Sequence, residues 1–151
     1  MEKKTDTWLE CVRCSKKYDT WQIRYLCDCG GVLDARRDLS KIDGEALRKK
    51  WDARWGMKRG VESSGVWRYR ELILDTPDDK VVTRQEGNTR LYEAGLAGKY
   101  AGLKNFLLKH EGENPTGSFK DRGMTCGATA ANILKASCVA CASTGNTSAS
   151  M

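Results

Sequence analysis

The clearest helical pattern in the N-terminal half of the chain lies between Asp38 and Lys58. Leu47, Trp51 and Trp55 recur there every four residues, and Asp43 stands before the run as a candidate N-cap. Large apolar side chains at this spacing are typical of a helix face that packs into a core. The pattern therefore predicts a packing helix whose tryptophans have no ligand-binding role.

Two short apolar runs flank a second helical pattern nearer the C-terminus. Residues 105–110 (NFLLKH) and 137–142 (SCVACA) have the composition of buried strands, and residues 119–135 between them form a helical pattern. The apolar side of this helix would consist of Met124, Ala128, Ala131 and Leu134. A strand, a helix and a second strand in this order are typical of an open parallel sheet. The predicted fold class is therefore α/β.

The segments between these two helices predict shorter elements. Residues 61–74 (VESSGVWRYRELIL) form a short helical segment whose Trp67, Leu72 and Leu74 can anchor it to a larger body, and residues 81–86 are extended. Gly95, Gly98 and Gly102 make the stretch that follows irregular. These segments lead into the second half of the α/β pattern.

Four cysteines in two pairs mark a separate unit at the N-terminus. They are Cys11, Cys14, Cys27 and Cys29. We expect each pair to sit in a tight turn, with Tyr18 in the strand that leaves the first pair and a strand over residues 21–26 that leads into the second. A unit of this size buries little core, so a tetrahedral zinc site of four thiolates would supply its stability.

The alternative to a zinc site is a reduced, metal-free extension with scattered thiols. The pair Cys27-x-Cys29 is one residue shorter than the usual zinc knuckle, but pairing at both ends favours a metal. Four thiolates leave no open position for a substrate, so the zinc would be structural. We predict a four-cysteine, zinc-ribbon-like module over residues 1–37 and a larger domain over residues 38–151.

Composition and charge restrict the class of protein. The chain has 151 residues, a formal charge of +6, 40% hydrophobic and 30% charged residues, and no apolar run long enough to span a bilayer. Its first residues, MEKKTDTW, lack the apolar core of a secretory signal, so we expect a cytoplasmic protein. Basic residues are interspersed with acidic ones, which favours small anionic metabolites over nucleic acid or membranes. The remaining cysteines, expected as small core residues, are Cys126, Cys138 and Cys141.

The stretch ENPTGSFKDRGM, residues 113–124, places Lys120 just inside a predicted helix start. Its Asn-Pro and Thr-Gly pairs are turn residues, and Ser118 offers a side-chain oxygen to cap a helix that begins near Phe119. A helix start is electropositive, which favours a nearby anion and the neutral, nucleophilic form of a lysine amine. We therefore predict carbonyl chemistry at Lys120, such as a Schiff base with an aldehyde cofactor.

A second polar loop, STGNTS at residues 143–148, follows the second predicted strand. Because ligands of open parallel sheets bind at the carboxyl edge of the strands, this loop and the lysine stretch are expected to face the same site. Its backbone amides and hydroxyl groups can hold a substrate carboxylate, and Asn146 can reach a cofactor substituent. As an isolated motif the loop would be only a helix cap, but its pairing with TGSFKDRG favours a ligand.

Together these stretches resemble the threonine synthases, a family within the fold type II, or tryptophan synthase β-like, pyridoxal phosphate enzymes. The resemblance is carried by KxExxNPTGSFKDRG at residues 109–123, STGNT at residues 143–147 and EGNT at residues 86–89. The four-cysteine module and GVWRYREL at residues 65–72 are features that other fold type II enzymes mostly lack. The resemblance covers nearly the whole chain.

This resemblance implies roles for the residues of both loops. Lys120 would hold pyridoxal phosphate as a Schiff base and, once released by substrate, would move protons at the substrate carbons. Phe119 would pack near the cofactor ring, and Asn146 would hydrogen-bond the phenolic oxygen of the cofactor. The residues that would hold the substrate and its α-carboxylate are Ser143, Thr144, Asn146 and Thr147.

The implied reaction is γ-elimination of phosphate from O-phospho-L-homoserine, followed by addition of water at the β-carbon to give L-threonine. Members of the family continue well beyond the length of this chain, and their glycine-rich loop for the cofactor phosphate has no match in it. We therefore expect a partial form, inactive by itself, of an enzyme that is a homodimer when complete. Arg90 stands where many members have proline. His110 is expected to have a structural role, since Lys120 can transfer the proton itself.

Two other functions stay open at this stage. One is a different fold type II enzyme that acts on a phosphorylated or hydroxylated amino acid, such as a cysteate synthase or a threonine deaminase-like lyase. The other is a non-catalytic zinc-ribbon fragment that binds nucleic acid through its basic surface, with a salt dependence set by phosphate contacts. The second function leaves TGSFKDRG and STGNTS without a role.

Overall fold

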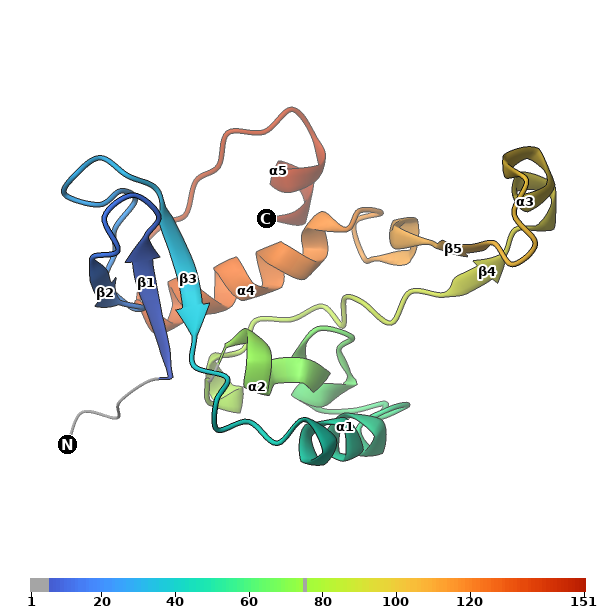
Figure 1. The fold of residues 1–151 in the computed structure, drawn as a ribbon, viewed down its shortest axis with the longest axis horizontal. Coiled ribbons are helices and arrows are strands. Elements are labelled where there is room, and N and C mark those ends of the chain that lie inside the picture. The colour runs from blue at the N-terminus through green and yellow to red at the C-terminus, as the bar shows by residue number, and fades with distance from the viewer. Residues whose placement is uncertain (1–5, 75) are drawn as a thin grey trace. The chain divides into compact units, whose positions relative to one another are not determined.

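The structure, a computed structural model, describes residues 6–74 and 76–151. The chain forms two compact units, residues 1–48 and 49–151, and the division falls within helix α1 (Gly44–Ala53). Figure 1 shows the elements of each unit coloured by their order along the chain.

The first unit is built on a small antiparallel sheet. Its strands are β1 (Thr7–Cys11), β2 (Lys17–Asp19) and β3 (Leu33–Arg37), in the order β2-β1-β3. Tyr18 lies in β2, the strand that leaves the first cysteine pair, as the sequence predicts. The buried hydrophobic side chains among the described residues of this unit are Cys11 and Cys27. The sheet therefore has almost no apolar core of its own.

The prediction of a strand over residues 21–26 is wrong. Asp19 Oδ1 accepts a hydrogen bond from Trp21 N at 2.8 Å, which turns the chain at the end of β2. Beyond this turn, Leu26 forms an isolated bridge with Val32. The alternation of polar and apolar residues is suitable for a strand, but the described part of the unit offers this segment no continuous partner.

Helix α1 begins as the sequence predicts. Asp43 Oδ1 accepts hydrogen bonds from the backbone N–H groups of Glu45 at 3.0 Å and Ala46 at 3.1 Å. The predicted core face is wrong, because no residue of α1 is buried and the helix ends at Ala53. Trp55 lies beyond this end and is 68% exposed.

A polar anchor at Arg54 takes the place of the expected tryptophan stripe. Arg54 is buried, and its guanidinium donates to both carboxylate oxygens of Glu71 at 2.8 Å and to Arg68 O at 2.7 Å. Trp51 contributes an edge-to-face contact with Tyr69, with ring centroids 5.1 Å apart. The end of α1 is therefore attached to residues 68–71 by polar contacts and one aromatic contact. The spacing of apolar residues does not predict these polar contacts.

The segment after α1 folds into short helical turns. These are the 3-10 turns η1 (Val61–Ser63), η2 (Trp67–Tyr69) and η3 (Asp78–Lys80), and helix α2 (Arg70–Ile73). The predicted anchoring is confirmed for Trp67, which is fully buried and whose Nε1 donates to Thr125 Oγ1 at 2.8 Å. It is wrong for Leu72, which is 39% exposed, and Leu74 is half-buried. Gly65 fits so closely against the next loop that a Cβ there would lie 2.0 Å from Asn88 N.

Helix α4 (Lys120–Ile133) covers most of the predicted range, but it buries a different face. Its buried residues are Asp121, Thr125 and Thr129. The predicted apolar side is half-buried or exposed: Met124, Ala128, Ala131 and Leu134. Thr125 Oγ1 donates to Val82 O at 2.7 Å, and Val82 N donates to Thr129 Oγ1 at 2.9 Å. The polar face is buried because its hydroxyl groups form hydrogen bonds with the backbone C=O and N–H groups of Val82, which lies outside the described strands.

Strands β4 (Leu91–Glu93) and β5 (Leu107–Lys109) form an antiparallel pair, with helix α3 (Gly95–Ala101) at the turn between them (Figure 1). The sequence predicts a buried strand over residues 105–110, but β5 is exposed and has no parallel neighbour. The stretch predicted as irregular contains α3, and Gly102, the residue that follows this helix, has φ +71°. Glycine adopts this left-handed conformation without strain.

Residues 137–142, the second predicted strand, form no strand and are exposed. Cys138 and Cys141 are exposed with them, so their prediction as core residues is wrong. No described strand lies beside this segment, so its backbone has no ladder to join. The chain then enters helix α5 (Asn146–Ser150), which contacts α4 (Figure 1).

The α/β character is therefore present as helices with two small antiparallel sheets. The described residues do not form the open parallel sheet that the sequence predicts. None of their helices is both long enough and apolar enough to cross a membrane.

Candidate functional site

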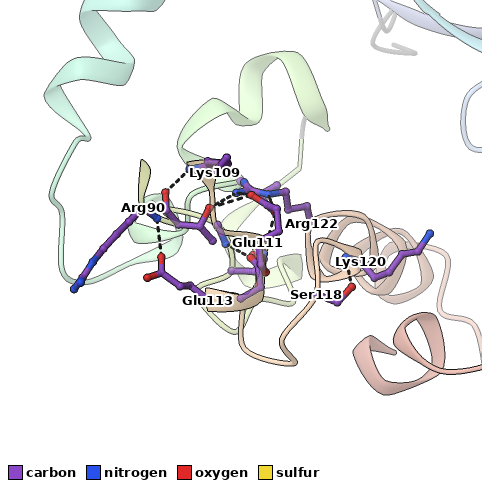
Figure 2. A network of polar contacts seen from close by, with 12 residues as sticks. Arg90, Lys109, Glu111, Glu113, Ser118, Lys120 and Arg122 are labelled. Carbon is purple, nitrogen blue, oxygen red and sulfur yellow. Dashed lines mark hydrogen bonds and ion pairs between the residues drawn. The ribbon is translucent and has the colours of Figure 1, made fainter. Parts of the chain in front are cut away.

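Lys120 occupies the first position of α4, as the sequence predicts. Ser118 Oγ accepts a hydrogen bond from Lys120 N at 3.2 Å, which satisfies one of the free amide groups at the helix start. The Lys120 side chain is half-buried, and its Nζ lies 4.8 Å from the centroid of the Phe119 ring. Lys120 makes no ion pair with any described residue. Figure 2 shows the side chain directed away from the neighbouring charged cluster.

The turn before Lys120 is held by the residue that follows it. Asp121 is buried, and its Oδ2 accepts from Thr116 N at 2.8 Å while its Oδ1 accepts from Thr116 Oγ1 at 2.5 Å. Gly117 within the turn has φ +77°, a conformation that favours glycine. Burial raises the pKa of Asp121, but hydrogen bonds from Ser150 and Thr116 lower it by more, so the carboxylate stays ionised.

The STGNTS loop reaches the lysine motif through the same aspartate. Ser150 Oγ in α5 donates to Asp121 Oδ1 in α4. Ahead of α5, Ser143 Oγ accepts a hydrogen bond from Gly145 N at 3.1 Å, and α5 begins at Asn146, inside this loop. The structure therefore brings α5 to the helix that carries Lys120.

The predicted ligand-binding residues lie at this junction with differing exposure. Phe119 is 56% exposed. Ser143, Thr144 and Asn146 are exposed, and Thr147 is half-buried. Their contacts with a cofactor and a substrate stay predictions.

A charged cluster beside the lysine helix joins the EGNT loop to the lysine motif (Figure 2). Arg122 donates from Nε to Glu111 Oε2 at 2.7 Å and from Nη2 to Glu111 Oε1 at 2.9 Å. Thr89 Oγ1 also donates to Glu111 Oε1 at 3.0 Å. This two-point ion pair fixes both position and angle, as arginine and carboxylate groups do elsewhere. The sequence reasoning gave Glu111 and Arg122 no role, because no local pattern links residues eleven positions apart.

Asn114 completes this connection from the lysine side. It is buried, and its Nδ2 donates to Glu111 O at 2.8 Å while its Oδ1 accepts from Gly87 N at 2.9 Å. Glu86, next to this glycine, is 2% exposed, and its carboxylate accepts hydrogen bonds from the hydroxyl groups of Ser64 and Thr83. Gly65 N also donates to Glu86 O at 2.8 Å, so hydrogen bonds fix the EGNT loop to both GVWRYREL and the lysine motif.

The Glu111–Arg122 pair makes stability depend on pH. The hydrogen bonds from Arg122, Thr89 and Asn114 lower the pKa of Glu111 from 4.5 to about 2, and burial opposes them. Below pH 4.5 the Glu111 carboxylate becomes protonated in the unfolded chain, whereas in the folded chain it stays ionised down to about pH 2. We therefore expect the free energy of unfolding to fall by about 2 kcal/mol as pH drops through this window.

The measurement is denaturant unfolding of the wild type and Glu111→Gln at several pH values. The variant cannot titrate at this position, so the stability difference between the two chains should shrink as the pH falls through the window. A difference that is constant with pH would contradict the assigned cause.

Arg90 supplies a backbone hydrogen bond at the place where many relatives are expected to have proline. Arg90 N donates to Glu113 Oε2 at 2.7 Å (Figure 2). Arg90 O accepts from His110 N at 3.1 Å. The His110 ring makes an edge contact with Tyr92, with centroids 5.9 Å apart. This loop therefore uses an N–H group that proline lacks.

The substitution Arg90→Pro should therefore destabilise the chain by about 1 kcal/mol relative to Arg90→Ala. Both variants lose the guanidinium, but only proline also removes the N–H that bonds Glu113. Thermal or denaturant unfolding of the two variants checks this. Equal stability would show that the hydrogen bond contributes nothing.

The four paired cysteines meet at one point of the first unit. Their Sγ atoms all lie within 4.8 Å of one another. The pairs Cys11–Cys29 and Cys14–Cys29 have Sγ–Sγ distances of 3.6 Å, and Cys14–Cys27 has 3.5 Å. Zinc–sulfur bonds of about 2.3 Å in a tetrahedron place sulfur atoms about 3.8 Å apart. The spacing and the soft donor atoms therefore fit a tetrahedral metal ion.

Nearby donors favour the thiolate form at two of these cysteines, Cys11 and Cys27. A hydrogen bond from Tyr18 and one from the backbone N–H of Cys29 lower the pKa of Cys27 to about 6. Arg13 N lies 3.4 Å from Cys11 Sγ and donates to it. A thiolate is the form that binds a metal.

Residues 82–151 match the family model described as pyridoxal-phosphate dependent enzyme. This segment contains the EGNT loop, Lys120 at the start of α4, and the STGNTS loop with α5. The match to pyridoxal-phosphate dependent enzymes therefore covers the candidate site and somewhat less than half of the chain.

The similar curated proteins are threonine synthases. The chain is 45% identical over 141 residues to the threonine synthase of Methanocaldococcus jannaschii. This alignment covers 93% of the chain and 33% of that relative. It is 43% identical over 146 residues to the enzyme of Methanosarcina acetivorans, with 95% and 33% covered. It is 37% identical over 147 residues to threonine synthase 2, chloroplastic, of Arabidopsis thaliana, with 91% and 28% covered. The chain spans about a third of the length of these relatives.

Proposed function

We propose that this chain carries the lysine-bearing part of a threonine synthase, an enzyme that releases phosphate from O-phospho-L-homoserine and adds water to give L-threonine. The observation that carries the proposal is the position of Lys120. It begins α4 without an ion pair to any described residue, and Asp121 beside it joins the TGSF turn to α5. Because the chain spans about a third of the similar threonine synthases, the reaction belongs to the complete enzyme.

The residues around Lys120 fit pyridoxal phosphate. The electropositive start of α4 suits an anionic cofactor. The Lys120 amine, which pairs with no acid in the described part of the chain, is able to bond an aldehyde carbon. Phe119 presents an exposed ring beside that amine, and Asn146 presents an exposed amide at the start of α5. We assign these three residues to the cofactor, which when bound supplies an electron sink for negative charge at the substrate carbons.

The protein's own part in the reaction is proton transfer and positioning. We assign the proton transfers at the substrate carbons to the Lys120 amine. The substrate α-carboxylate would be held by the hydroxyl and amide groups of the second loop, namely Ser143, Thr144, Asn146 and Thr147. Hydroxyl and amide donors bind a carboxylate without a cation, so the loop needs no lysine or arginine of its own.

We also propose that Cys11, Cys14, Cys27 and Cys29 bind a structural zinc ion in a zinc-ribbon-like module over residues 1–37. The fit of the sulfur spacing to a tetrahedron and the scarcity of apolar core in the unit support this proposal. Four thiolates leave no coordination position for a substrate, so the metal takes no part in the reaction. Residues 38–151 would then form the N-terminal part of the cofactor-binding domain.

A chimeric enzyme tests the proposed activity. This chain would replace the matching third of the Methanocaldococcus jannaschii threonine synthase, which would supply the remainder of the site. We expect phosphate release and threonine formation from O-phospho-L-homoserine, and no activity with Lys120→Ala in the same chimera. A folded chimera that binds pyridoxal phosphate but processes another amino acid in preference would overturn the assignment of substrate.

A further inference from the structure

Tyr18 lies at the centre of β2, beside the four-cysteine group, and its hydroxyl makes a contact that the zinc proposal does not use. Tyr18 Oη lies 3.0 Å from Cys27 Sγ, and the residue is half-buried. β2 pairs with β1 so that Tyr18 stands opposite Leu9, close to the end of β1 that bears Cys11. The strand therefore directs a phenol group at one of the proposed ligands.

The direction of this hydrogen bond follows from the other contact of the hydroxyl. Asp28 N donates to Tyr18 Oη at 3.3 Å, so the phenol oxygen already accepts one hydrogen bond. A metal-bound thiolate has no hydrogen to give and can only accept. The phenol hydrogen therefore points to Cys27 Sγ, and the tyrosine links this sulfur to the backbone of the next residue.

The Tyr18 ring is held in place by two cations that share one carboxylate. The Arg24 guanidinium lies 4.3 Å from the ring centroid and Lys16 Nζ lies 5.5 Å from it. Both cations pair with Asp28, each at 2.6 Å. Cation–π contacts and ion pairs at this range restrict the orientation of the ring, so the hydroxyl is fixed relative to Cys27.

We propose that Tyr18 is a positioning residue of the zinc site, which donates a hydrogen bond to the Cys27 thiolate and thereby tightens the hold of the module on its metal. The inference rests on the proposed zinc site. Four thiolates around Zn²⁺ give the site a net charge of about −2. A hydrogen-bond donor to one of the sulfur atoms stabilises part of this negative charge. Residues that support metal ligands in this way typically contribute tenfold or more to metal affinity.

The test compares Tyr18→Phe with Tyr25→Phe in the 151-residue chain. Tyr18→Phe removes the hydroxyl but keeps the ring between Lys16 and Arg24, whereas Tyr25 is 89% exposed and makes none of these contacts. Zinc affinity is measured by competition with a chromophoric chelator. We expect about tenfold weaker binding for Tyr18→Phe, with one zinc per chain in both variants and wild-type affinity for Tyr25→Phe.

A second readout separates the hydrogen bond from a general loss of structure. With Co²⁺ in place of zinc, loss of a donor to sulfur should move the thiolate-to-cobalt absorption band of Tyr18→Phe to lower energy, because the sulfur electrons become easier to remove. Equal zinc affinity and an unshifted band in Tyr18→Phe would overturn the role of Tyr18 and leave the zinc site standing. A wild-type chain that binds no zinc would overturn both proposals together.

Discussion

Removal of zinc will unfold the first unit and leave the lysine helix in place. The described residues of this unit bury only Cys11 and Cys27 among their hydrophobic side chains, so the three strands have little apolar surface to hold them together. A structural zinc ion contributes on the order of 10 kcal/mol in modules of this size, far more than three short strands supply. Metal binding should therefore decide whether residues 7–37 are folded.

Amide hydrogen exchange before and after chelation measures this effect. We expect the amides of β1 and β3 to lose protection, and those of α4 to keep it. Cys11→Ala should reproduce the loss without a chelator. Cys126→Ala is the matched control, because Cys126 lies half-buried on α4, outside the metal-binding group. Protected strands in a metal-free chain would contradict the structural role of zinc.

Pyridoxal phosphate will modify Lys120 in preference to the other lysines of the chain. The cofactor is an anion, and the start of α4 attracts anions while its end repels them. Lys135, just past the end of the same helix, is the matched comparison. Opposite effects of about 0.7 kcal/mol at the two helix ends amount to a preference on the order of tenfold.

The experiment traps the lysine adduct with borohydride and maps it by peptide mass spectrometry. We expect the main adduct at Lys120, its disappearance in Lys120→Ala, and no change at Lys120 in Lys135→Ala. Labelling spread equally over exposed lysines would contradict the assignment of Lys120. This test needs no turnover, so it applies to the 151-residue chain itself.

The connections around Lys120 explain how loops distant in sequence form one site. Asp121 accepts hydrogen bonds from Thr116 in the turn before the lysine and from Ser150 in α5. On the other side, Glu111 and Arg122 fasten the EGNT loop. Polar side chains therefore position the candidate site where hydrophobic contacts are few.

The parts that sequence predicts well are those governed by neighbouring residues. The Asp43 cap of α1, the Ser118 cap before Lys120, and the turn at Ser143 ahead of α5 all depend on groups within three positions of one another. The same holds within each cysteine pair, whose two members stand two or three positions apart. Local chemistry alone determines these features.

The parts that sequence predicts badly depend on distant partners. Residues 137–142 have the composition of a strand, but a strand exists only where another backbone lies beside it. Trp55 fits a helical stripe, yet the helix ends first and Arg54 is buried through its bonds to Glu71. In each case the local pattern is compatible with the predicted state, and a long-range contact or its absence decided against it.

By itself, the sequence determined the lysine at a capped helix start, the serine and threonine loop before α5, and a four-thiolate group near the N-terminus. Only the tertiary structure decided that α4 buries threonines instead of its apolar side, that Asp121 joins the two loops, and that Glu111 pairs with Arg122. The physical reason is the separation along the sequence over which each interaction acts. Capping and ligand spacing act over a few residues, whereas burial and ion pairing depend on which segments meet in space.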